Sequence, residues 1–263
     1  MNTLLQRTDA AVLGLVIFVG MILMIILGRR VGKVWNREQS EPKGGVGSLF
    51  AALFALSGLI LAFTFGMSQN RLERVRGVVE VEANDLGTAI LRADLYPDSE
   101  RKAFRADFKN YLDAVIAFYE NATDFDRVHK AKDDAAKAAE RLWARAAIQS
   151  KLPNMFLPSQ QMVPALNDMF DIAQRREIVL RSKIPDLIVY MLFICVLAGC
   201  FIGGFTSGNF GRADWIIIGG FVFVTSMVVY TTLDLSRPLR GIITDVPGRE
   251  AIVELRSMFN ETK

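Results

Sequence analysis

The sequence is poor in the residues from which metal sites, disulfides and many active sites are built. Its only histidine, His129, lies in a charged stretch, and its two cysteines, Cys195 and Cys200, lie five residues apart inside an apolar run. That spacing does not bring two side chains to one face of a helix, and a zinc site needs several Cys or His ligands. We therefore expect no metal, no disulfide and no cofactor.

Signatures of catalysis and of nucleic-acid binding are also missing. The sequence contains no nucleophile motif and no phosphate-binding loop, so we expect no enzymatic activity. Its 31 basic and 28 acidic residues give a net charge of +3. They form no concentrated basic stripe with interleaved aromatic residues, which is the pattern of a nucleic-acid-binding surface. We therefore expect no nucleic-acid partner.

Charged residues are absent from the interiors of four long apolar runs. A helix needs roughly 20 apolar residues to cross the hydrocarbon core of a bilayer, where an unpaired backbone amide is costly. The runs extend from Ala10 to Gly28, from Gly47 to Met67, from Pro185 to Thr206 and from Asp214 to Leu235. The sequence thus predicts four transmembrane helices in a lipid bilayer.

The region between the second and third runs has the composition of a helical soluble domain. It lacks the alternating pattern of strands, and its apolar residues between Phe104 and Tyr119 recur at three- and four-residue spacing, as on one face of a helix. We predict an all-α fold with transmembrane helices 1 and 2 in residues 1–67, an inserted helical domain in 68–184, transmembrane helices 3 and 4 in 185–235 and a tail in 236–263. The second transmembrane helix is expected to continue to Arg92.

Basic residues beside the apolar runs indicate the topology. Arg71, Arg74 and Arg76 follow the second run, and Arg237 and Arg240 follow the fourth. By the positive-inside rule, the inserted domain and both termini are expected to be cytoplasmic. Basic residues at positions 29 to 37 favour the opposite orientation for the first helix alone.

Four short segments carry a family pattern. They are the stretch Phe54–Phe65, the stretch from Glu82 to Arg92 that contains Asn-Asp-Leu-Gly-Thr-Ala, the stretch Leu166–Asp171 with Arg175, and Leu-Asp-Leu-Ser-Arg-Pro at 233–238. Together they resemble the bestrophin-like family of prokaryotic and plant membrane proteins. The resemblance extends over residues from about 45 to 245.

The resemblance implies a ring-shaped, homo-oligomeric ion channel with four membrane helices per subunit and a cytoplasmic helical domain. Five subunits are implied, and four remain an alternative. The partners would be inorganic ions and further copies of the chain, and the location would be the inner (plasma) membrane of a bacterium. Bacterial relatives of bestrophins conduct cations and animal bestrophins conduct anions, so the resemblance leaves ion selectivity open. The acidic calcium-clasp cluster of animal bestrophins is missing from this sequence, so calcium gating is not expected.

The second apolar run offers candidate pore-lining residues. Ser57, Leu61, Thr64 and Ser68 recur at four, three and four residues and form one weakly polar stripe. In a symmetric ring Leu61 would form a hydrophobic constriction able to gate by dewetting, and Glu82, on the same face of a continuous helix, would form an acidic ring that favours cations. The rotation of the helix is not fixed by sequence, so three phenylalanines are alternative constriction residues, namely Phe54, Phe63 and Phe65.

Each of these candidates also has a structural interpretation. Hydroxyl side chains in membrane helices often pack between helices or bond to their own backbone, and Glu82 would then pair with Arg92 or Arg76. Seven further residues are predicted to form a structural polar network: Arg92, Asn167, Asp168, Asp171, Arg175, Asp234 and Arg237. The alternative function is a membrane sensor or scaffold whose helical domain binds a partner or a small ligand.

Overall fold

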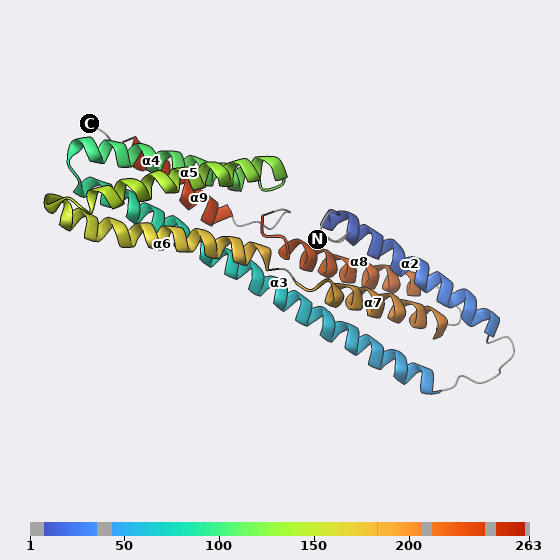
Figure 1. The fold of residues 1–263 in the computed structure, drawn as a ribbon. Coiled ribbons are helices and arrows are strands. Elements are labelled where there is room, and N and C mark those ends of the chain that lie inside the picture. The colour runs from blue at the N-terminus through green and yellow to red at the C-terminus, as the bar shows by residue number, and fades with distance from the viewer. Residues whose placement is uncertain (1–7, 36–43, 183, 207–211, 240–245, 261–263) are drawn as a thin grey trace. The chain divides into compact units, whose positions relative to one another are not determined.

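The computed structural model describes residues 8–35, 44–182, 184–206, 212–239 and 246–260. This part of the chain is helical throughout and contains no strand, so the all-α prediction is confirmed (Figure 1). The chain divides into two compact units. We call the described residues up to Arg71 together with 184–236 the membrane unit, and residues 72–182 with 237–260 the helical unit.

The membrane unit consists of α2 (Ala10–Trp35), the first part of α3 (Gly44–Arg92), α7 (Asp186–Thr206) and α8 (Arg212–Leu235). Each of the four predicted runs lies in a helix that is long and apolar enough to cross a membrane, as the sequence predicted. Helix α3 continues without a break to Arg92, also as predicted. The thiols of Cys195 and Cys200, both in α7, are not joined in a disulfide.

Helices α2 and α7 lie side by side and approach each other backbone to backbone (Figure 1). A Cβ atom added at Gly28 would lie 2.0 Å from the carbonyl oxygen of Phe201, and one added at Gly204 would lie 2.2 Å from that of Ile25. At Gly32 the corresponding distance, to the carbonyl oxygen of Phe205, is 2.4 Å. Only glycine fits at these three positions, and small residues of this kind allow membrane helices to pack closely.

Helix α8 packs against α2 in the core of this unit. Its Val222 and Val229 are fully buried, as is Met21 of α2. The ring of Tyr230 covers Gly14 on α2, with its Cβ 3.3 Å from the position that a Cβ atom would occupy there. The resulting core is apolar, which suits helices that have lipid on their outer faces.

The helical unit is built from the second part of α3, α4 (Asp98–Glu120), α5 (Phe125–Gln149) and α6 (Phe156–Arg181). Short 3-10 helices follow α3 at Ala93–Leu95 (η1) and precede α6 at Pro153–Met155 (η2), and the chain ends in α9 (Val246–Glu254) and η3 (Leu255–Phe259). Helix α4 begins immediately after Pro97. Asp124 caps α5, because its carboxylate accepts from the backbone N–H groups of Asp126 and Arg127.

The core of the helical unit follows the predicted apolar stripe of α4. Phe104, Phe108, Leu112 and Ile116 are fully buried there, and α4 lies against α5 along its length (Figure 1). Helices α3, α5 and α6 complete this core with fully buried aliphatic side chains, namely those of Leu86, Ile90, Leu142 and Leu166. From the tail, Ile252 of α9 is buried in the same cluster.

Candidate functional site

The hydroxyl stripe on α3 is buried within the single chain. Ser57 is 8% exposed, Thr64 1% and Ser68 0%. Each hydroxyl donates to the carbonyl oxygen four residues earlier in the same helix, at 2.8, 2.7 and 3.0 Å respectively. These bonds satisfy the hydroxyls inside α3, while Leu61, the fourth member of the stripe, is half-buried.

Another face of α3 carries large exposed apolar side chains. Phe63 is 65% exposed and Leu59 is 52% exposed, and the two residues lie one helical turn apart. Phe54 and Phe65 are also exposed, although the ring of Phe54 lies 5.0 Å from that of Phe221 on α8. The three alternative constriction residues are thus all exposed in the single chain.

Glu82 lies in the core of the helical unit and is 1% exposed. Its Oε1 accepts from the guanidinium of Arg176 on α6, and its Oε2 accepts from the hydroxyl of Tyr119 on α4 at 2.7 Å. Glu82 is therefore paired with Arg176, and not with Arg92 or Arg76, the two partners expected from the sequence. Arg76 pairs instead with Glu73, at 3.6 Å.

The surroundings of this ion pair are strongly apolar and aromatic. Burial raises the pKa of Glu82, against the opposing effects of the Arg176 charge and the Tyr119 hydrogen bond. Burial, followed by the charge of Glu82, raises the pKa of the Tyr119 hydroxyl. The guanidinium of Arg176 also lies over the ring of Phe118, 4.5 Å from its centroid. Its Nε atom, however, has no hydrogen-bond partner.

The chemistry of this cluster is structural. Desolvation lowers the pKa of Arg176, but the negative charge of Glu82 and the nearby tyrosines outweigh this effect, so the pKa is raised overall and the guanidinium stays charged. The two charges and the Tyr119 hydroxyl connect α3, α4 and α6 at one buried point. Periodicity could have identified Arg176, since it follows Leu166, Met169 and Ile172 on the buried face of α6.

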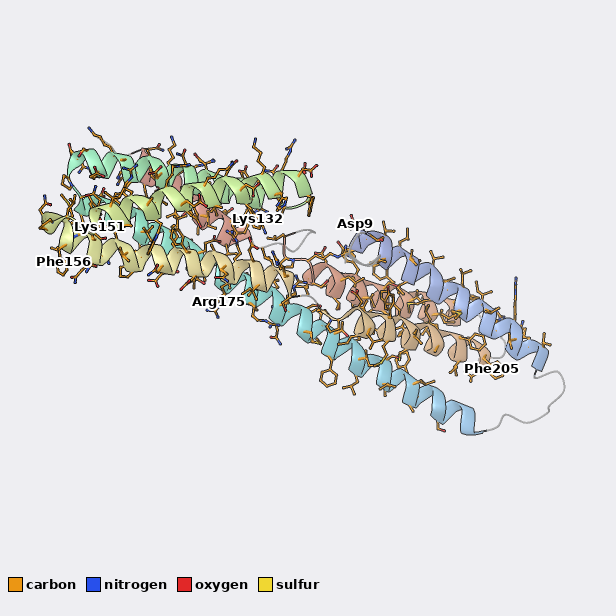
Figure 2. All side chains as sticks on the ribbon, in the orientation of Figure 1. Asp9, Lys132, Lys151, Phe156, Arg175 and Phe205 are labelled. Atoms are coloured by element: carbon orange, nitrogen blue, oxygen red, sulfur yellow. The ribbon has the colours of Figure 1, made fainter. Side chains whose placement is uncertain are left out.

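The remaining predicted network residues are distributed over both units. On α6, the side chains of Asn167, Asp168, Asp171 and Arg175 are exposed, and Arg175 is labelled on that helix in Figure 2. Burial, and after it the negative charge of Asp168, raises the pKa of Asp85 on α3, so these two carboxyl groups are neighbours.

The other three network residues lie near the ends of helices. Arg92 is half-buried at the end of α3, and Arg237 is half-buried in the helical unit. Asp234 is buried near the end of α8 in the membrane unit. The predicted joint network of all seven residues stays a prediction. Among the described residues there is no group of three or more His, Cys, Asp or Glu side chains that could hold a metal ion.

The fold and the buried cluster define an all-helical protein with a four-helix membrane unit and a helical unit fixed by a buried ion pair. Comparison with protein families gives a match over residues 14–244 to the Bestrophin-like domain. The chain belongs to this bestrophin-like family, as the sequence resemblance indicated.

Solved structures with the same fold come from a bacterial bestrophin homolog of Klebsiella pneumoniae. One is 14% identical, with a TM-score of 0.66, and the match covers 95% of this chain and 99% of that one. A variant of the same homolog is 13% identical, with a TM-score of 0.66 and coverage of 97% and 98%. A variant of a protein described as a membrane protein is 14% identical, with a TM-score of 0.60 and coverage of 93% and 97%. A comparison with curated protein sequences gave no match.

Proposed function

We propose that this chain is the subunit of a homo-oligomeric ion channel that conducts ions passively through a central pore lined by α3. Membership of the bestrophin-like family supports this function, since that family is one of channels. Four helices that suit a bilayer support it as well. The observation that carries the proposal is the face of α3 with Leu59 and Phe63, which the chain's own helices leave more than half exposed.

The proposed constriction is apolar. In a symmetric ring each position becomes a ring of identical side chains, and a ring of large apolar groups gates a pore by excluding water. Phe63, with Leu59 one turn earlier, fits this role because it is more exposed than Phe54 and Phe65. The hydroxyl stripe fits it less well, because Ser57, Thr64 and Ser68 are buried and bonded to their own helix.

The predicted preference for cations requires Glu82 to face the pore. An acidic ring selects ions when its carboxylates face water, whereas the Glu82 carboxylate is 1% exposed and engaged by Arg176 and Tyr119. These contacts support a structural role for Glu82, so the proposed channel takes no selectivity from this residue.

The proposed orientation follows from the flanking charges. We place the helical unit and both termini in the cytoplasm, because Arg71, Arg74 and Arg76 follow the apolar part of α3 directly. The proposed location is the bacterial inner membrane. The proposed assembly has five subunits, with four as the alternative.

The test is reconstitution of the purified chain into planar bilayers. We expect single-channel currents, and we expect Phe63→Ala to increase the conductance or the open probability because it widens an apolar constriction. Phe223→Ala is the matched control, since Phe223 is 62% exposed on α8 and faces lipid in this proposal. Absence of current above the lipid background across a range of salts and pH would contradict conduction. Equal effects of the two variants would contradict the assignment of the constriction.

A further inference from the structure

The membrane unit contains a cavity of about 480 Å³. Its volume lies within the range of pockets that hold small molecules, roughly 300–1,000 Å³. All four helices of the unit contribute to its wall. The residues used below are Ile25 of α2, Ser57 and Gly58 of α3, Gly199, Cys200 and Thr206 of α7, and Phe221 of α8.

The wall of this cavity is mostly apolar: three of its lining residues carry a hydroxyl, namely Ser57, Thr206 and Thr225, Cys200 carries a thiol, and the others are apolar residues or glycines. The Ser57 hydroxyl donates to the carbonyl oxygen of Leu53 at 2.8 Å, and the Thr206 hydroxyl donates to that of Ile202 at 3.0 Å. Both donors are thus satisfied within their own helices. Water is stable in a buried site only where it finds two or more polar partners. The chemistry of the wall therefore selects an apolar occupant.

Missing side chains create part of the space. A Cβ atom added at Gly58 or at Gly199 would meet no atom within 4 Å. This is the opposite of Gly28 and Gly204, where an added Cβ would collide with backbone. Two groups of glycines in the same unit thus differ in their effect: one group brings α2 and α7 together, and the other leaves room beside α3 and α7.

Two basic residues of α2 follow its cavity-lining residue along the helix. Ile25 lines the cavity, and Arg29 follows it one turn later on the same face of α2. The Arg29 guanidinium lies 5.9 Å from the ring centroid of Trp215 at the start of α8. Arg30, the next residue of α2, is exposed. The end of α7 lies at the same level, because Gly32 meets the carbonyl oxygen of Phe205, next to Thr206 on the wall.

We propose that this cavity binds an anionic membrane phospholipid, with an acyl chain between α3, α7 and α8 and the phosphate beside Arg29 and Arg30. The surrounding solvent of four apolar helices is lipid, so acyl chains are the most abundant apolar occupants at this depth. An apolar wall with arginines beyond one end suits a ligand that has an apolar part and a negatively charged group at one end. An anionic phospholipid has both. A guanidinium group binds phosphate oxygens through charge-assisted, often bidentate hydrogen bonds on either side of a membrane. The inference does not depend on ion conduction.

The experiment uses the full chain in nanodiscs that contain phosphatidylglycerol with a photoactivatable group on its acyl chain. After irradiation, mass spectrometry maps the adducts. We expect adducts on wall residues, Cys200 and Phe221 among them, and we expect Gly199→Leu to abolish most of them by filling the cavity. Gly219→Leu is the matched control, because Gly219 is also open to an added side chain but lies outside the wall. It should keep the wild-type pattern.

The headgroup assignment has a separate readout. We expect the double variant Arg29→Gln and Arg30→Gln to lose the preference for phosphatidylglycerol over phosphatidylcholine probes while keeping adducts on the wall. A preference that survives in this variant would overturn the headgroup assignment.

Three results would overturn the acyl-chain site. The first is wild-type labelling confined to outward-facing residues such as Ile216 and Phe223. The second is unchanged wall labelling in Gly199→Leu. The third is protein–protein cross-links that place a neighbouring subunit in the cavity. If Gly199→Leu does not give a folded protein, Gly58→Leu fills the cavity from α3 and takes its place. The wild-type map decides on the site independently of any variant.

Discussion

Arg176 and Glu82 form a buried ion pair across 94 residues of sequence. Their side chains are 7% and 1% exposed, and the Tyr119 hydroxyl completes the hydrogen bonding of the carboxylate. Two charges at this depth are stable only together, because each alone would have lost its hydration without compensation. The pair therefore requires α3 and α6 to adopt one specific register inside the helical unit.

Removing one partner of this pair should be strongly destabilising. We expect Arg176→Met to lower the free energy of unfolding by about 3–5 kcal/mol, because the buried carboxylate of Glu82 is left unpaired. The measurement is chemical unfolding of the purified full chain in detergent. Arg175→Met is the matched control, since Arg175 is the exposed neighbour of Arg176 (Figure 2), and its effect should stay within about 0.5 kcal/mol. Equal effects of the two substitutions would contradict the structural role of the pair.

The close backbone contact of α2 and α7 at their glycines should not tolerate a larger residue. Gly28→Ala would place a methyl group 2.0 Å from the carbonyl oxygen of Phe201, so the two helices would have to separate. We expect a loss of at least about 1–3 kcal/mol, as for other overpacked sites, seen as a lower thermal unfolding temperature in detergent. Gly219→Ala meets no atom within 4 Å and should be neutral or slightly stabilising, because alanine favours the helix. A tolerated Gly28→Ala would contradict the close crossing.

The Lys132–Glu177 pair between α5 and α6 should make stability depend on pH. The Nζ of Lys132 lies 2.9 Å from Oε1 of Glu177. Burial raises the pKa of Glu177, but the hydrogen bond and charge of Lys132, with the charges of Arg181 and Arg176, outweigh it and lower that pKa below 4.5. The carboxylate thus adds stability above pH 4.5, and this contribution disappears as the pH falls through the lower pKa of the folded state.

Lys132→Met tests this dependence. We expect the variant to lose about 0.2–1 kcal/mol of unfolding free energy at pH 7, the usual range for a partly exposed ion pair. The difference between wild type and variant should shrink as the pH is lowered below 4.5. A difference that is constant between pH 7 and pH 3 would contradict the assignment to Glu177.

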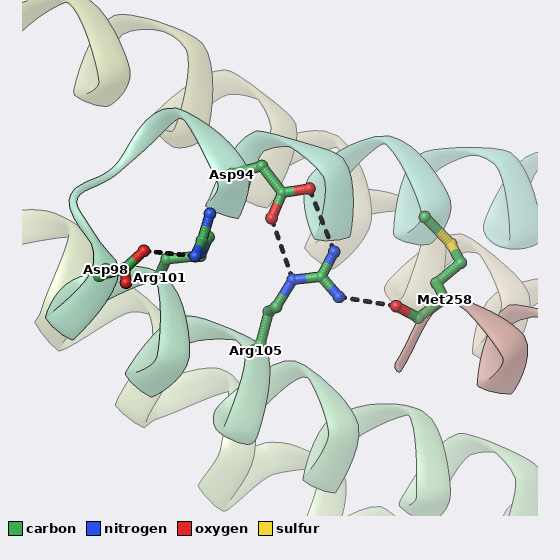
Figure 3. A network of polar contacts seen from close by, with 5 residues as sticks. All are labelled: Asp94, Asp98, Arg101, Arg105 and Met258. Atoms are coloured by element: carbon green, nitrogen blue, oxygen red, sulfur yellow. Dashed lines mark hydrogen bonds and ion pairs between the residues drawn. The ribbon is translucent and has the colours of Figure 1, made fainter. Parts of the chain in front are cut away.

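Arg105 should control how firmly the tail is held on the helical unit. Its guanidinium donates to both carboxylate oxygens of Asp94, at 3.0 and 3.1 Å, and to the carbonyl oxygen of Met258, at 2.6 Å (Figure 3). Its side chain also lies over the ring of Phe259, 6.0 Å from the centroid. We expect Arg105→Gln to accelerate amide hydrogen exchange in residues 252–260, because the tail loses its bond to α4.

Arg101→Gln is the matched control for this prediction. Arg101 lies one turn earlier on α4, and the contact drawn for it is with Asp98 of the same helix (Figure 3). Its replacement should leave exchange in the tail unchanged. Unchanged exchange in Arg105→Gln as well would show that other contacts, such as Arg256 with Asp113 at 3.1 Å, hold the tail by themselves.

Sequence patterns predicted the elements of this fold well. Four uncharged runs predicted the helices of the membrane unit because lipid admits few alternatives, and the spacing from Phe104 to Tyr119 predicted the buried face of α4. These features depend on local chemistry, so they are readable from short stretches of sequence.

Rotation and long-range pairing were not predictable in the same way. A hydroxyl stripe on a membrane helix serves a water-filled pore or bonds back to its own helix, and the sequence does not distinguish the two. The structure has Thr64 donating to Ile60. Arg92 and Arg76 are near Glu82 in sequence, but the partner is Arg176, whose relevance depends on how α6 packs against α3.

The backbone contact between Gly28 and the end of α7 also sets the order of events during synthesis. Gly28 and Phe201 are separated by 173 residues, and at about 5–20 residues per second the ribosome needs roughly 9–35 s to make the chain between them. Small domains fold within microseconds to seconds, so the intervening helices have time to fold first. The newly inserted N-terminal helix must therefore wait in the bilayer with its glycine face uncovered, and any factor that shields nascent membrane segments would act at this stage.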